Sequence, residues 1–167
     1  MEALWSRFIP SYNKVRDDIK NGVIGDVLHS EVTFGVKTDH VERVLKKELG
    51  GGNALDTGIY TANWSQFVHG SQKPKRVCFF RYACCINDLL LIFDNFPQIV
   101  ANGHLFPSGT DSSFGAVITY ENGGIATLAT NSHARFDAAT AQVHGTKGSI
   151  TLHFPFWDVV TIIFLSC

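Results

Sequence analysis

Charge is scarce in this chain and forms no block of one sign. Of its 167 residues, 17% are Asp, Glu, Lys or Arg, and the formal net charge is −1. No basic run is longer than two residues, as at Lys46-Lys47. Nucleic-acid-binding domains carry a basic face, and basic clusters attract membrane surfaces and polyanions. The sequence therefore predicts no nucleic-acid partner and no membrane.

Cysteine and long apolar runs are also scarce. The four cysteines are Cys78, Cys84, Cys85 and Cys167. They show neither zinc spacing nor a disulfide framework, which favours free thiols in a reducing compartment. The N-terminus lacks the basic-then-apolar order of a signal peptide. The apolar run 159–167 is too short for a membrane helix, which needs about 20 residues. A cytoplasmic location is expected.

Two kinds of site motif are missing. No Gly-x-Gly-x-x-Gly follows a predicted strand, so the sequence offers no cradle for the phosphates of a dinucleotide. The seven histidines include no spacing such as His-Glu-x-x-His. No metal is expected.

Helical patterns dominate the first part of the chain and strand patterns the second. The first part predicts a short strand at 1–8, a helix from Pro10 to Gly22 with Tyr12, Val15 and Ile19 on one side, a strand at 27–36, a helical turn at 41–45 and a helix at 53–68. Asn53 is the predicted N-cap of this last helix, and Gly70 its end. The second part predicts a strand at 76–80 and two hairpins, 114–131 around 121–124 and 140–153 around 145–148.

This order predicts an α+β fold, an open, mostly antiparallel sheet with helices on one face. Two apolar segments fit it poorly, 83–107 and 159–167. Each is either an element of its own, an extra helix or a last strand, or sequence foreign to the fold.

A glycine run opens the helix predicted at 53–68. Gly50-Gly51-Gly52 favours a turn that lets the helix begin close to a pocket, although an anion site at the helix start is an alternative. Asp56 and Tyr60 follow, four residues apart, and on a helix they share one face. A carboxylate and a phenol there can orient and protonate a carbonyl or hydroxyl. The alternative is the polar face of a surface helix.

Several motifs agree in order and spacing with one family. They are Met-Glu-Ala-Leu-Trp at 1–5, Glu-Val-Thr-Phe-Gly at 31–35, Gly-Gly-Gly-Asn-Ala-Leu-Asp-Thr-Gly-Ile-Tyr at 50–60, Gln-Lys-Pro at 72–74 and Gly-Thr-Lys-Gly at 145–148. With them the chain resembles the dimeric dihydrodiol dehydrogenases of the wider Gfo/Idh/MocA oxidoreductase family. The resemblance covers about 1–80 and 108–158.

The resemblance implies half of a two-domain enzyme. Such enzymes have a Rossmann domain that binds NADP(H), followed by an α/β domain with an open sheet. Residues 1–9 then correspond to a remnant of the last Rossmann strand and 10–158 to the substrate-binding and dimerisation domain, with a poorly matching insertion at 83–107 and a non-matching tail at 159–167. The Rossmann domain and the lysine of its Glu-Lys-Pro motif are absent from this sequence. NADP is thus expected in the full-length family, and no cofactor for this chain alone.

The resemblance also assigns site residues. Asp56 and Tyr60 correspond to an acid/base pair beside the missing lysine, without whose charge Tyr60 is expected to be a plain hydrogen-bond donor. Trp5, Phe34 and Trp157 correspond to aromatic residues lining the substrate pocket; ordinary core or surface aromatics are the alternative. Arg7 follows Trp5 and is expected near the nicotinamide or substrate, with a surface arginine as the alternative.

Three hypotheses for function follow. By resemblance, the chain derives from an NADP-dependent dehydrogenase that transfers hydride from a trans-dihydrodiol or D-xylose, and alone it is expected to be inactive. The second is a non-catalytic binding module that pairs through the open sheet face with a second copy, as a homodimer, or with a full-length relative. The third is an incomplete gene product whose exposed apolar surface favours aggregation.

Overall fold

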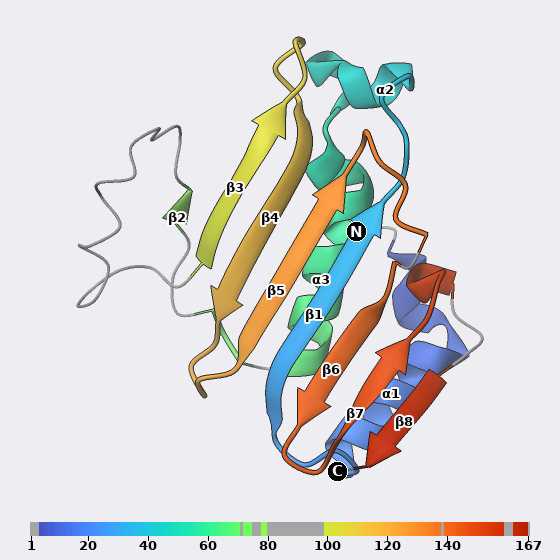
Figure 1. Cartoon of the computed structure of the whole chain (residues 1–167), viewed down its shortest axis with the longest axis vertical. Helices are drawn as coiled ribbons and strands as arrows, with labels where there is room; N and C mark the ends of the chain where they lie inside the picture. Colours follow the sequence, from blue (N-terminus) through green and yellow to red (C-terminus); the bar gives the residue numbers. More distant parts are fainter. Residues whose placement is uncertain are drawn as a thin grey trace.

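A sheet of eight strands with helices on one face forms most of the structure (Figure 1). The computed structural model describes residues 4–70, 72–74, 78–79, 99–137, 139–158 and 162–166. The strands are β1 (Val27–Gly35), β2 (Cys78–Phe79), β3 (Ile99–Leu105), β4 (Asp111–Thr119), β5 (Ile125–Asn131), β6 (Ala141–Gly145), β7 (Gly148–Leu152) and β8 (Ile162–Ser166). The helical elements are η1 (Trp5–Phe8), α1 (Pro10–Lys20), α2 (Glu42–Leu45), η2 (Lys47–Leu49), η3 (Ala54–Gly58), α3 (Ile59–His69) and η5 (Phe156–Asp158).

The strand order is β2-β3-β4-β5-β1-β6-β7-β8. Both predicted hairpins are present, as β4–β5 and β6–β7, and most neighbouring strands are antiparallel. The predicted α+β class with an open, mostly antiparallel sheet is confirmed. Two pairs, β1–β5 and β2–β3, are parallel. The long strand β1 lies between the two hairpins and joins them into one sheet (Figure 1).

The core lies between the sheet and its helices. α3 lies against β1 and β5, and Figure 1 shows α1 on the same side, behind β7 and β8. Tyr12 of α1 and Trp64 of α3 are fully buried and meet edge to face, with ring centroids 5.6 Å apart. Val32 and Ile150 are buried from the sheet side. Burial of such large side chains is the main contribution to the stability of the fold.

The opposite face of the sheet carries no helix in the described structure. One row of side chains crosses it from Val117 through Thr127, Glu31, Gln142 and Thr151 to Ile163. The next row runs from Thr119 through Ile125, His29, His144 and Ser149 to Leu165. Glu31 is the only Asp, Glu, Lys or Arg in these two rows, which we call the open face.

Two local predictions are wrong. Residues Trp5–Phe8 form a 3-10 helix rather than a strand, because the backbone N–H of Arg7 donates to the Leu4 carbonyl. Asn53 does not cap the helix after it: its backbone is helical and its side chain makes no cap bond. The helix begins instead with the wide π turn η3, and the Asp111 carboxylate accepts the N–H of Ala54 at 2.6 Å.

The two poorly fitting segments contain strands where the structure describes them. Ile99–Leu105 form β3, which pairs with β4, and Ile162–Ser166 form β8, which pairs with β7. Of the strand predicted at 76–80, Cys78–Phe79 form β2. Residues 83–98 and 159–161 lie outside the described structure.

Candidate functional site

Four of the predicted site residues meet in one aromatic cluster. The indole nitrogen of Trp5 donates a hydrogen bond to the phenol oxygen of Tyr60 at 2.9 Å. Phe34 contacts Tyr60 edge to face, with ring centroids 5.7 Å apart, and stacks on Trp157 at 4.0 Å. These side chains come from η1, β1, α3 and η5, so the fold assembles a site that is dispersed in the sequence. We call these four residues the aromatic cluster.

The members of the aromatic cluster differ in access to solvent. Phe34 is only 5% exposed, whereas Trp5 is 44% exposed. The hydroxyl of Ser6 donates to the carbonyl oxygen of Trp157 at 2.9 Å and ties η1 to η5. The partly exposed indole of Trp5 is the ring of these two that a small ligand with an apolar side can contact.

Tyr60 is oriented by its neighbour. Because the Trp5 N–H occupies a lone pair of the phenol oxygen, the phenol hydrogen remains available to a ligand. Tyr12 lies deeper; burial, with a contribution from Tyr60, raises the pKa of the Tyr12 phenol above its ordinary value. The Tyr60 hydroxyl thus accepts from Trp5 and keeps its own hydrogen for donation.

Asp56 has a different partner. Its Oδ1 lies 2.7 Å from a guanidinium nitrogen of Arg43 on α2. The Asp56 side chain is 16% exposed and that of Arg43 is 62% exposed. Asp56 and Tyr60 occupy one continuous helical segment, η3 and α3, but no hydrogen bond joins them in the described structure. The predicted pair therefore consists of two groups that are positioned separately.

The start of this segment is fixed by a buried polar network. The Asn53 amide nitrogen donates to the hydroxyls of Thr57 at 2.9 Å and Ser132 at 2.6 Å. The Thr130 hydroxyl donates to the side-chain amide oxygen of Asn53, Oδ1, at 2.6 Å. Buried polar groups that are all paired hold one geometry firmly. The network thereby attaches the turn that contains Asp56 to the end of β5.

Arg7 lies in a groove on the helical side of the sheet. The groove has a volume of about 550 Å³ and is lined by Arg7, Phe8, Asn13, Arg16, Gln66, Phe67 and Gly70. Arg7 makes no ion pair with the residues that the structure describes. The structure does not connect it to the aromatic cluster by a hydrogen bond.

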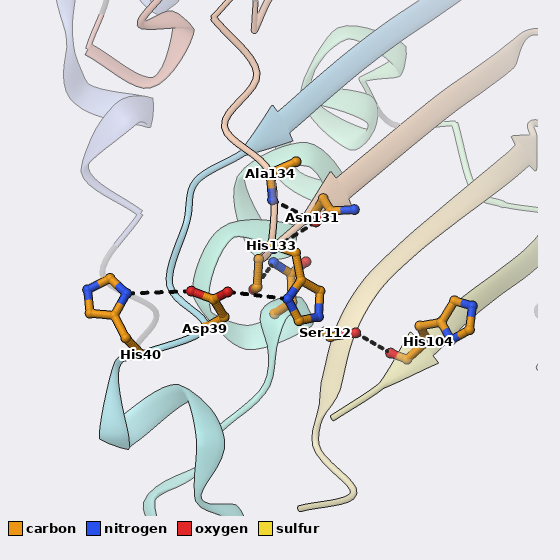
Figure 2. Close-up of polar contacts among 9 residues, drawn as sticks. Asp39, His40, His104, Ser112, Asn131, His133 and Ala134 are labelled. Carbon is orange, nitrogen blue, oxygen red and sulfur yellow. Dashed lines mark hydrogen bonds and ion pairs between the residues drawn. The ribbon is translucent and has the colours of Figure 1, made fainter. Parts of the chain in front are cut away.

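Sequence reasoning missed a second polar group, centred on Asp39 (Figure 2). Its carboxylate lies 3.4 Å from Nδ1 of His133 and 3.6 Å from Nδ1 of His40. Although desolvation opposes it, hydrogen bonding to His133 and the charge of Lys37 lower the pKa of the Asp39 carboxyl. Asn131 accepts the backbone N–H of His133 and holds this loop in place.

The Asp39 group has no local sequence signal, because its members come from loops far apart in the chain. It does not form a metal site. Across the described ranges, no group of three or more His, Cys, Asp or Glu side chains is arranged to hold a metal ion.

The described residues do not fit a whole dinucleotide. Aromatic rings and Tyr60 can face a flat ring, but no glycine-rich turn between a strand and a helix offers backbone N–H groups to a pyrophosphate. Within the described parts of the chain, no helix has the length and apolar character needed to cross a membrane.

Comparison with known proteins places the chain. Residues 12–151 match the family profile described as GFO/IDH/MocA C-terminal domain. The trans-1,2-dihydrobenzene-1,2-diol dehydrogenase of Xenopus tropicalis is 31% identical over 163 residues, which are 98% of this chain and 42% of that enzyme. The human enzyme of the same name is 29% identical over 159 residues, 94% of this chain and 40% of that enzyme. The chain thus spans about two fifths of the length of these relatives.

Solved structures share the fold. An aldose-aldose oxidoreductase from Caulobacter crescentus, complexed with glycerol, superposes with a TM-score of 0.72 at 16% identity, covering 96% of this chain and 43% of that chain. KijD10, a 3-ketoreductase from Actinomadura kijaniata in complex with NADP, superposes with a TM-score of 0.65 at 18% identity, covering 93% and 41%. In both, the shared part is less than half of the larger protein.

Proposed function

The chain belongs to the GFO/IDH/MocA family, as a C-terminal domain of these oxidoreductases, and we propose that it forms the substrate side of a dehydrogenase for cyclic trans-diols or aldoses such as D-xylose. The curated relatives named above are dihydrodiol dehydrogenases. NADP is the proposed hydride acceptor in a complete enzyme, since KijD10 was solved with NADP.

The observation that carries this proposal is the hydrogen bond from Trp5 to Tyr60 within the aromatic cluster. The partly exposed indole of Trp5, packed in a cluster with the buried Phe34, offers an apolar surface to the carbon skeleton of a ring-shaped substrate. Tyr60 offers a hydrogen to a substrate oxygen, and Asp56 offers a carboxylate one turn away on the same helical segment. The chain's own residues thus bind and orient a hydroxylated substrate.

Calorimetric titration tests the substrate proposal. Trans-cyclohexane-1,2-diol and D-xylose are added to the wild-type chain and to Tyr60→Phe, which keeps the ring and removes the hydroxyl. We expect binding to the wild type and about tenfold weaker binding to the variant, as for loss of one hydrogen bond. Equal binding to both proteins contradicts the assigned role of Tyr60.

A parallel titration with NADPH tests whether the cofactor site belongs to another domain. Because the described residues lack a pyrophosphate cradle, we expect no saturable binding to the chain alone. Saturable binding at micromolar NADPH contradicts the proposal that the cofactor site belongs to another domain.

The open face supports a second role, homodimer formation. Its two rows of side chains cross the sheet with Glu31 as their only charged residue, and Val117, Ile125 and Leu165 are exposed there. Interface cores are depleted of charge in this way. We propose that a second copy of the chain, or a longer relative, covers this face.

A further inference from the structure

The glycine run at 50–52 packs closely against the backbone of α2. The backbone N–H of Gly51 donates to the Lys46 carbonyl at 2.9 Å, and that of Gly52 donates to the Val44 carbonyl at 2.9 Å. A Cβ atom on Gly51 would lie 2.6 to 2.7 Å from the carbonyl oxygens of Lys46, Val44 and Arg43. Any side chain at this position therefore pushes the glycine run away from α2.

This contact determines the position of the Arg43 side chain. Arg43 lies on α2, which rests on Gly51, and its guanidinium contacts Asp56 Oδ1 at 2.7 Å. On the other side of that contact, Asp56 is held by the turn that Asn53 and Asp111 fix. Two separately anchored elements thus meet in a single ion pair.

The ion pair decides what Asp56 can do. A carboxylate paired with a guanidinium accepts hydrogen bonds in a fixed orientation. Its second oxygen, Oδ2, has no hydrogen-bond partner in the described structure and is the oxygen left for a ligand. Tyr60, whose oxygen already accepts from Trp5, keeps its hydrogen for donation.

We propose that Arg43 is a positioning residue for Asp56, and that Gly51 is required because only glycine lets α2 bring Arg43 to that carboxylate. The site then offers one fixed acceptor, Asp56, and one fixed donor, Tyr60. A pair of hydroxyls matches this arrangement: one donates to Asp56 and the other accepts from Tyr60. The inference rests on the proposed substrate role of the site.

Carboxylate labelling tests the positioning directly. The folded chain is treated with a water-soluble carbodiimide and glycinamide, and amidation of Asp56 is followed by peptide mass spectrometry, with Asp137, 87% exposed, as the internal reference. We expect amidation of Asp56 to be several-fold faster in Arg43→Gln than in the wild type, because the carboxylate loses its partner. Arg43→Lys restores part of the protection. Equal rates in the wild type and Arg43→Gln overturn the proposal.

A glycine pair provides the matched control. Gly51→Ala is expected to speed amidation of Asp56 as Arg43→Gln does. Gly50→Asn is expected to leave the amidation rate unchanged, because a Cβ atom on Gly50 would have no other atom within 4 Å. Gly50 has a φ of +70°, and asparagine tolerates that backbone conformation. If Gly51→Ala does not fold, Arg43→Gln decides alone, since the exposed Arg43 contributes little to the core. Identical labelling in Gly51→Ala and Gly50→Asn removes the role of Gly51.

A ligand pair separates positioning from a merely structural role. Affinity is measured for trans-cyclohexane-1,2-diol and for cyclohexanol, which has a single hydroxyl. We expect Arg43→Gln to weaken diol binding about tenfold and to change cyclohexanol binding less than about twofold. Equal weakening of both ligands shows damage to the whole site and overturns the positioning role. If the wild type binds neither, the proposed substrate is wrong, and the labelling still decides whether Arg43 positions Asp56.

Discussion

Trp5 and Tyr60 lie 55 positions apart in the sequence, and the indole N–H of the first donates to the phenol oxygen of the second at 2.9 Å. This bond links the 3-10 helix η1 to α3 and orients the Tyr60 hydroxyl. Trp5 therefore does more than add an aromatic ring to the cluster. It decides which atom of Tyr60 is offered to a ligand.

Replacing Trp5 with phenylalanine tests this role. The variant keeps an aromatic ring but loses the N–H donor, so diol affinity should fall several-fold, while the free energy of unfolding changes by less than about 1 kcal/mol because Trp5 is partly exposed. Calorimetry and urea denaturation measure the two quantities. Phe8→Leu, also on η1 and exposed, is the control and should change neither. Unchanged affinity in Trp5→Phe refutes the orienting role.

The network around Asn53 predicts a large loss of stability. Asn53→Ala leaves the buried hydroxyls of Thr57, Thr130 and Ser132 short of partners, which should lower the free energy of unfolding by about 2–3 kcal/mol. Asn13→Ala, at an exposed position on α1, should cost less than about 0.5 kcal/mol. Urea denaturation of both variants checks this. Similar losses in the two variants would show that the network does not hold the turn.

Stability should depend on pH through His69. Burial, with a smaller contribution from His29, lowers the pKa of His69 from its ordinary value of 6.5 to about 4. Between these two values the unfolded chain binds a proton that the folded chain does not, so stability is full above pH 6.5 and falls as the pH drops toward 4. A loss of about 1–3 kcal/mol is expected.

Urea denaturation at pH 7 and pH 4.5 measures this loss. His69→Gln, which cannot titrate, should lose less stability than the wild type over the same interval. His153→Gln, at an exposed position, is the control and should behave as the wild type. A wild-type chain equally stable at both pH values contradicts the assignment.

The open face predicts an effect on association. Val117→Arg adds a second charged side chain to a row in which Glu31 is the only one, so the homodimer should dissociate. Val23→Arg, exposed away from the sheet, should leave it intact. Sedimentation equilibrium measures both. A wild-type chain that stays monomeric at high concentration removes the homodimer proposal.

Most of the fold could be predicted from local sequence patterns. The two hairpins were predictable because Gly123 and the turn at 145–148 lie between short strands. The parallel pairing of β1 with β5 was not, since it joins segments far apart in the chain and no local pattern encodes it. Within the strand expected at 1–8, the prediction was wrong for Trp5–Phe8, because an apolar, aromatic composition does not distinguish a strand from a 3-10 turn.

The candidate site, too, could be predicted only in part. Resemblance to the family indicated Trp5, Phe34, Tyr60 and Trp157, and the fold brings these four together. It gave no indication of Arg43, because a single charged residue in a polar connection looks like any surface residue. Only the packing of α2 on Gly51 reveals its partner.

The indole N–H signals of the three tryptophans in a proton–nitrogen NMR spectrum test the central claim most directly. Trp5 and Trp157 belong to the aromatic cluster, whereas Trp64 is buried in the core and donates to the Gln142 carbonyl. On addition of trans-cyclohexane-1,2-diol, we expect saturable shifts of the Trp5 and Trp157 signals and an unmoved Trp64 signal. No shift at Trp5, or equal shifts of all three, would contradict a substrate site at the aromatic cluster.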